Sequence, residues 1–182
     1  MRTQVFNDFD AFAASVRDVD SRMLSRNPKR RVWSTSSVDL GRIDLQIGRL
    51  GSGNVAQGQL RSDGYMLYLP LTEKVEYSAN GCTLQTKSFA ILEPGCEFCI
   101  STKVEHDWCV AFIPTILLDQ GVNGARACRV IGSNRQAADR FRETLLQIFD
   151  TAASRRHFES SLAASRAAEE VLRIANLVLG LR

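Results

Sequence analysis

The 182-residue sequence predicts an α+β fold in which an antiparallel β-barrel or jelly roll lies between a short N-terminal helix and a helical C-terminal region. The first observation is a series of about seven to nine short apolar segments, separated by turn residues, within residues 31–114. Small barrels and jelly rolls are built from such strands. The second observation is an apolar repeat of three and four residues within 115–182, which is typical of amphipathic helices. We therefore divide the chain into 1–30, 31–114 and 115–182.

The composition is that of an ordinary globular domain, with 45% hydrophobic and 24% charged residues. No run approaches the roughly 18 consecutive apolar residues that cross a bilayer, and the N-terminus lacks the layout of a secretory signal. The cysteines are odd in number, which argues against a disulfide framework: Cys82, Cys96, Cys99, Cys109 and Cys128. We expect a cytoplasmic protein. Its net charge of +3 is too small to indicate nucleic-acid binding over the whole surface.

The N-terminal zone predicts a helix. Phe9, Phe12, Val16 and Val19 follow one another at intervals of three, four and three, which places them on one helical face. The pattern fades near Leu24, where we expect the helix to end.

The middle zone carries the strand signals. The stretch 42–47 alternates apolar and polar residues, whereas 65–71 is a continuous apolar run, as expected for a strand buried on both faces. Asn80-Gly81 is the dipeptide best suited to the two positive φ angles of a tight hairpin, and it lies between two short strand-like segments. Further strands are predicted at 89–94, 97–101 and 107–114.

Two helices are expected at the C-terminal end. Ser133 with Gln136 forms a possible capping box before the first, and the second runs from about Phe158 to Leu179. The second helix has an apolar stripe, which either packs on the barrel or pairs with a second copy across a dimer interface. The stripe comprises Ala164, Ala168, Val171, Leu172, Ala175 and Val178.

The strand series resembles the N-terminal regulatory domain of AraC/XylS-type transcription regulators. The similar features are Arg-Ser-Asp-Gly-Tyr at 61–65, the hairpin, the Glu-Pro-Gly turn at 93–95, and the Ile-Pro exit at 113–114 with its two leucines. The resemblance implies a cupin-like barrel that binds an effector, followed by a helical dimerisation region that forms a homodimer. In that family a separate helix-turn-helix region binds DNA, and we expect no such region within these 182 residues.

An enzyme is the weaker interpretation. Metal-binding cupins use about two or three histidines, but this chain has only His106 and His157. Phe98 stands where the family's Pro-Gly-x-x-His turn would place a ligand, and a phenyl ring binds no metal. We interpret His106 as a loop residue and the glycines at 48–53 as a turn. We expect no catalytic residues, no metal and no cofactor.

Residues 26–30, RNPKR, have the spacing RxxxR just before the barrel, which resembles the N-terminal motif of PilZ-type receptors for cyclic di-GMP. Guanidinium groups can grip phosphate bidentately and can donate to guanine O6 and N7. An aromatic face nearby could stack on a base. The second PilZ motif, [Asp/Asn]-x-Ser-x-x-Gly, has no match. The resemblance implies cyclic di-GMP as the ligand, and the predicted binding residues are Arg26, Arg30, Arg31, Trp33 and Thr35.

Three alternatives remain open at this point. The basic segment could be a solvated linker or an arm that touches DNA in a longer protein, and Trp33 could be plain barrel core. The effector could instead be a small organic molecule inside the barrel. In that case we expect the lining to comprise Tyr65, Leu67, Leu69, Phe89, Ile91, Trp108 and Val110.

Overall fold

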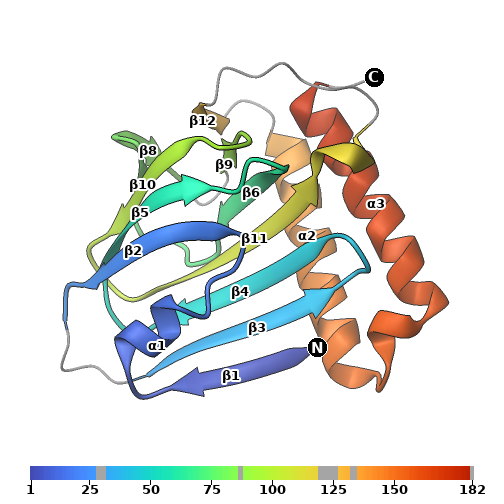
Figure 1. Ribbon diagram of the computed structural model, residues 1–182, viewed down its shortest axis with the longest axis horizontal. Coiled ribbons are helices and arrows are strands. Elements are labelled where there is room, and N and C mark those ends of the chain that lie inside the picture. Colours follow the sequence, from blue (N-terminus) through green and yellow to red (C-terminus); the bar gives the residue numbers. More distant parts are fainter. Residues whose placement is uncertain (28–31, 86–87, 119–126, 132–134, 181–182) are drawn as a thin grey trace.

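The computed structural model describes residues 1–182 except 28–31, 86–87, 119–126, 132–134 and 181–182 (Figure 1). Two antiparallel sheets form the barrel. The larger one consists, in spatial order, of β1 (Arg2–Phe6), β3 (Trp33–Asp39), β4 (Asp44–Leu50), β11 (His106–Pro114), β6 (Gly64–Pro70), β9 (Phe89–Leu92) and β12 (Cys128–Ile131). The smaller one consists of β2 (Val19–Ser25), β5 (Asn54–Leu60), β10 (Glu97–Thr102), β7 (Tyr77–Ala79) and β8 (Cys82–Leu84).

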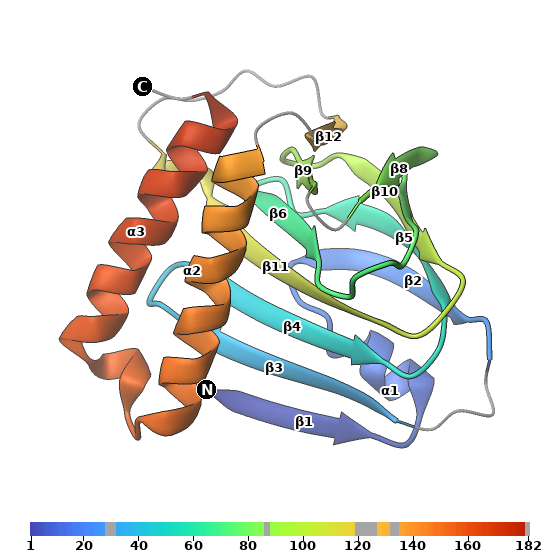
Figure 2. The same cartoon turned by 180° about the vertical axis from the view of Figure 1, so that it is seen from behind.

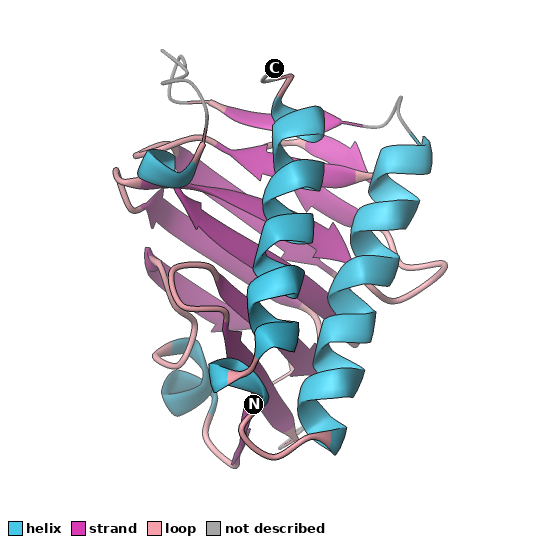
Figure 3. Cartoon of the chain, turned by 90° about the vertical axis from the view of Figure 1, so that its right-hand side faces the viewer, coloured by secondary structure: helices cyan, strands magenta, loops and turns pink. Residues whose placement is uncertain are grey.

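Two long helices, α2 (Arg135–Ser154) and α3 (Leu162–Leu179), lie side by side across one face of the larger sheet (Figure 3). A short helix, α1 (Phe9–Ala13), and two 3₁₀ turns, Thr115–Leu117 and Phe158–Ser160, complete the described elements. This is the predicted α+β, cupin-like barrel with a helical C-terminal region. No helix among the described residues has the length and hydrophobicity to cross a membrane.

The centre of the larger sheet is apolar on both faces, as β6 illustrates. Tyr65, Leu67 and Leu69 pack in one core with the helices, whereas Met66 and Tyr68 pack in a second core with the smaller sheet. A strand between two apolar layers has no polar face, so its sequence reads as a continuous apolar run. The stripe of α3 packs into the first core through Ala164, Val171 and Ala175, among others.

The N-terminal zone differs from the prediction. The helix ends at Ala13, and residues 19–25 form β2, which pairs with β5 from Val19 opposite Leu60 to Ser25 opposite Asn54. Residues 2–6, for which no strand was predicted, form β1 at the edge of the larger sheet. Pairing with β5 decides the conformation of β2, because strand formation depends on neighbours more than on local preference. Because β1 and β2 precede residue 31 and β12 follows residue 114, the strands extend beyond the predicted barrel range of 31–114 at both ends.

The local signals of the turn and of the last helix are confirmed. Asn80 and Gly81 have φ angles of 47° and 80° between β7 and β8. The last helix begins at Leu162, four residues later than predicted, because the Ser161 side chain caps it by accepting a hydrogen bond from the Ala164 amide (3.3 Å). It ends at Gly180, whose φ of 73° is left-handed. Ser133, of the predicted capping box, lies outside the described residues.

The sequence interpretation placed Gly48 in a turn, and this was wrong. Gly48 lies within β4. A Cβ atom at this position would lie 2.3 Å from the indole ring of Trp108, on the neighbouring strand β11. The glycine is therefore explained by close packing against a large ring in the barrel interior.

An ion pair between a half-exposed arginine and a buried carboxylate connects β12 to the residue that follows β9. Arg129 Nε lies 2.8 Å from Glu93 Oε1, and the Glu93 side chain is only 5% exposed. The Ala127 amide donates to Glu93 Oε2 (3.2 Å). Arg129→Ala would leave a buried carboxylate with one fewer donor, so we expect the free energy of unfolding to fall by about 1–3 kcal/mol.

Urea denaturation measures this change. The matched control is Arg42→Ala, since Arg42 is exposed and has no ion pair with another described residue. An Arg129→Ala variant as stable as the Arg42→Ala variant would contradict a stabilising role for this pair.

Candidate functional site

The predicted basic segment connects β2 to β3 at one end of the barrel. Figure 2 shows the start of β3 beside the end of β4, on the side of the barrel remote from α2 and α3. The Arg26 amide donates to the Gly53 carbonyl oxygen (2.8 Å), and the Gly51 amide donates to the Val32 carbonyl oxygen (3.2 Å). Arg26, at the start of the segment, and Val32, directly after it, are thus both hydrogen-bonded to the connection between β4 and β5 (Asn54–Leu60).

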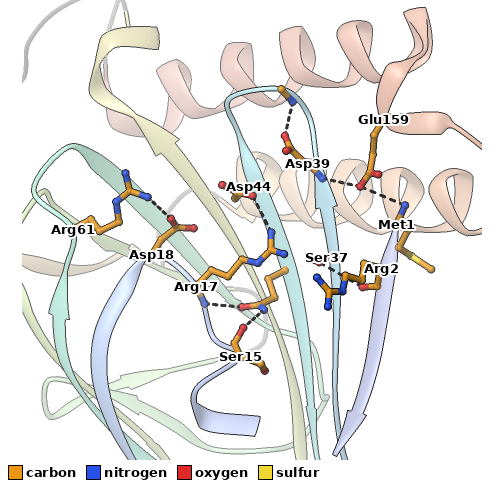
Figure 4. Close-up of polar contacts among 12 residues, drawn as sticks. Met1, Arg2, Ser15, Arg17, Asp18, Ser37, Asp39, Asp44, Arg61 and Glu159 are labelled. Carbon is orange, nitrogen blue, oxygen red and sulfur yellow. Dashed lines mark hydrogen bonds and ion pairs between the residues drawn. The ribbon is translucent and has the colours of Figure 1, made fainter. Parts of the chain in front are cut away.

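Arg26 has an exposed side chain that forms no ion pair with any described residue. Arg30 and Arg31 lie outside the described residues, so their predicted roles stay predictions. The arginines near the opposite end of the barrel differ from Arg26 in this respect. Figure 4 shows Arg61 beside Asp18 (2.8 Å) and Arg17 beside Asp44 (3.3 Å).

Trp33 and Thr35 point into the barrel and not toward Arg26. Trp33 is 2% exposed and packs edge-on against Phe9, with ring centroids 5.5 Å apart. Thr35 is also buried, 3.5 Å from the Ser15 hydroxyl. Alternate residues of a strand face the same side, so Trp33 and Thr35 share the inward face of β3. The core interpretation of Trp33 is confirmed, and these two residues do not form a surface site with Arg26.

A groove of about 630 Å³ opens at this end of the barrel, and its lining includes Val32, which directly follows the basic segment. Within it Arg49 lies opposite Ser34 on β3 and opposite Asp107 on β11. Sequence reasoning missed this row of side chains, because strand neighbours cannot be assigned before the sheet order is known. The groove is lined by Val32, Ser34, Arg49, Leu50, Gly51, Thr72, Glu105, His106 and Asp107.

His106 is not the loop residue that the sequence suggested. It begins β11 and is buried, with Nδ1 2.8 Å from Thr102 Oγ1 and 3.0 Å from the Val104 carbonyl oxygen. Its ring packs edge-on against Tyr77. Burial lowers the pKa of His106 to about 4, although the Val104 hydrogen bond opposes this. The imidazole is therefore neutral at pH 7, with a structural place in the barrel.

The barrel interior is nearly filled. The cavity between the sheets has a volume of about 40 Å³, close to the roughly 30 Å³ that one water occupies in the liquid. Drug-sized ligands occupy pockets of about 300 Å³ or more, so an organic effector would require the interior to open. Asn54, His106, Tyr68 and Trp108 are the lining residues whose side chains carry polar atoms.

The expected lining of this interior was partly wrong. Trp108 and Val110 line the cavity, but the remaining five residues contribute to the core beneath the helices: Tyr65, Leu67, Leu69, Phe89 and Ile91. Because side chains alternate along a strand, choosing the wrong face of β6 misplaces every residue on it.

Phe98, at the position where metal-binding cupins have a histidine, lies in the apolar cavity wall. Within the described ranges, no group of three or more histidine, cysteine, aspartate or glutamate side chains is arranged to hold a metal ion.

Comparisons with known proteins identify the fold. No protein-family model and no curated protein sequence matches the chain. Among solved structures, the AraC-like transcriptional activator CuxR matches 100% of this chain and 70% of its own, with a TM-score of 0.72 and 14% identity. Apo ToxT K231A from Vibrio cholerae matches 80% of this chain and 59% of its own, with a TM-score of 0.51 and 9% identity. At these identities the likeness shows the fold, and this chain shares its barrel-and-helix fold with CuxR over its whole length.

Proposed function

We propose that this chain is the ligand-sensing and dimerisation domain of an AraC-type transcription regulator, and that it binds cyclic di-GMP through the basic segment at 26–31. The observation that carries the regulator assignment is the likeness to the AraC-like activator CuxR across the full chain. Both halves of the fold are included in that match, the barrel and the helices. DNA binding would belong to a separate helix-turn-helix region.

The charge arrangement supports an anionic ligand at the end of the barrel. Arg26 is exposed there without an acidic partner among the described residues, whereas Arg17 and Arg61 are already paired with carboxylates. Cyclic di-GMP carries two phosphate charges and two guanines. An arginine side chain can bind either group, since its planar fork fits phosphate oxygens and guanine O6 and N7 equally. Arg30 and Arg31 follow Arg26 closely enough in sequence to join it.

Isothermal titration calorimetry with cyclic di-GMP tests this proposal. Arg26→Ala and Arg30→Ala would each remove a charge-assisted hydrogen bond worth about 1.5–3 kcal/mol, so affinity should fall by about 10- to 100-fold. Arg42→Ala is the matched control. Arg42 is an exposed arginine at the opposite end of β3 and β4, in their connecting turn. Equal affinities in the wild type and the Arg26→Ala and Arg30→Ala variants would overturn the assignment of the ligand to this segment.

The dimer assignment rests on the outer surface of the helices. The inner faces of α2 and α3 are already packed on the sheet, yet Leu162 and Leu177 of α3 are 69% and 61% exposed. A second copy would cover such side chains. Light scattering with and without cyclic di-GMP measures the assembly, and a monomer in both conditions would contradict this part of the proposal.

A further inference from the structure

One row of side chains in the groove combines a cation and an anion near the end of the basic segment. Ser34, Arg49 and Asp107 are direct cross-strand neighbours on β3, β4 and β11. The groove that contains them also includes Val32 and Gly51, which join the end of the basic segment to the β4–β5 connection. The row therefore lies beside Val32, the residue that directly follows the basic segment at 26–31, and it consists of described residues alone.

Arg49 and Asp107 are available for a ligand. Arg49 Nε lies 3.8 Å from Asp107 Oδ2, and the two side chains are 71% and 42% exposed. A charge-assisted hydrogen bond between such groups is about 2.7–2.9 Å long, so this contact is loose. An exposed pair of this kind contributes little to stability. A ligand could thus bind to both groups without breaking a strong interaction.

The backbone of Asp107 is held firmly, which fixes the origin of its side chain. Its amide donates to Thr72 Oγ1 (2.7 Å), and its carbonyl oxygen accepts from the Tyr77 hydroxyl (2.7 Å) and the Leu71 amide (2.9 Å). A group that is already positioned loses less entropy when it binds a ligand. Glu105 also lines the groove, but Asp107 lies directly opposite Arg49.

We infer that Asp107 and Arg49 read one guanine of the bound dinucleotide, and this inference rests on the proposed function. The two acceptor oxygens of Asp107 match the N1–H and N2–H donors of guanine, and the fork of Arg49 matches O6 and N7. Val32, which is 70% exposed, supplies an apolar surface for the base. This pair would provide the base contacts for which the sequence has no second PilZ motif.

Calorimetry with two ligands separates base reading from phosphate binding. Cyclic di-IMP has the same phosphates as cyclic di-GMP but lacks the N2 amino group. The wild type should prefer cyclic di-GMP by about 10-fold or more, the scale of one hydrogen bond to a charged group. Asp107→Asn should weaken cyclic di-GMP binding by about 10-fold or more and reduce the preference to within about 3-fold. Arg49→Ala should weaken binding of both ligands, because both keep O6 and N7.

The control variant is Asp20→Asn, which removes an exposed carboxylate from β2 and should leave both affinities at the wild-type values. Thermal unfolding midpoints check that each variant is folded. If Arg26→Ala weakens binding while Asp107→Asn keeps the full preference, the inference is overturned and the proposed function stands. The inference would also be overturned if Asp107→Asn reduced the affinities for the two ligands by the same factor. It would likewise be overturned if Glu105→Gln, and not Asp107→Asn, abolished the preference for cyclic di-GMP. A wild type that binds neither ligand would overturn both proposals.

Discussion

Phe141→Ala is expected to lower the free energy of unfolding by about 3–5 kcal/mol. Phe141 lies on α2 and is fully buried in the core that joins the helices to the larger sheet, where Leu145 and Tyr65 are also buried. Alanine would lose the transfer free energy of the ring and leave a cavity that the rigid sheet can fill only in part. Urea denaturation followed by circular dichroism measures the loss.

Leu146→Ala is the matched control on the same helix, because Leu146 is next to Leu145 but 37% exposed. We expect it to cost less than about 1 kcal/mol. If Phe141→Ala were no more destabilising than Leu146→Ala, the helices would not contribute to the core of this fold as described above.

The second large effect is a pH dependence of stability that comes from His106. Burial lowers the pKa of His106 to about 4 in the folded protein, against 6.5 for the free side chain. Between these values the unfolded chain binds a proton more readily than the folded one. The stability contributed by the neutral ring is therefore fully present above about pH 6.5, and it is lost progressively as the pH falls toward 4. A shift of this size corresponds to about 3 kcal/mol.

His106→Gln removes the titrating group while keeping a polar side chain near Thr102 and Val104. Between pH 6.5 and 4 its free energy of unfolding should fall by about 3 kcal/mol less than that of the wild type. Parallel curves for the wild type and His106→Gln, measured by urea denaturation across this range, would contradict a neutral, buried His106.

The sequence predicted those parts of the fold that local patterns determine. The Asn80-Gly81 hairpin, the buried strand at 65–71 and the two C-terminal helices depend on turn geometry and apolar spacing, and all are present. The prediction failed at β2. Its apolar residues fit a helical repeat, but the segment is a strand that pairs with β5. Partners that lie 29 to 41 residues away leave no signal in the local pattern.

The candidate site was harder to predict than the fold. Trp33 and Thr35 were placed beside the arginines by proximity in sequence, yet a strand that begins at Trp33 directs both side chains inward. Arg49 and Asp107 had no signal at all, since they become neighbours only when β4 pairs with β11. The binding role of the basic segment thus stays a prediction from sequence spacing, whereas the sheet register alone shows that Arg49 and Asp107 are neighbours.

We expect the arginine-rich segment at 26–31 to bind a doubly charged guanine dinucleotide. The most direct measurement is a calorimetric titration of the wild-type chain with cyclic di-GMP at low and at physiological ionic strength. We expect saturable binding whose affinity decreases as salt rises, because exposed charges carry much of the interaction. An absence of binding at either ionic strength would contradict it.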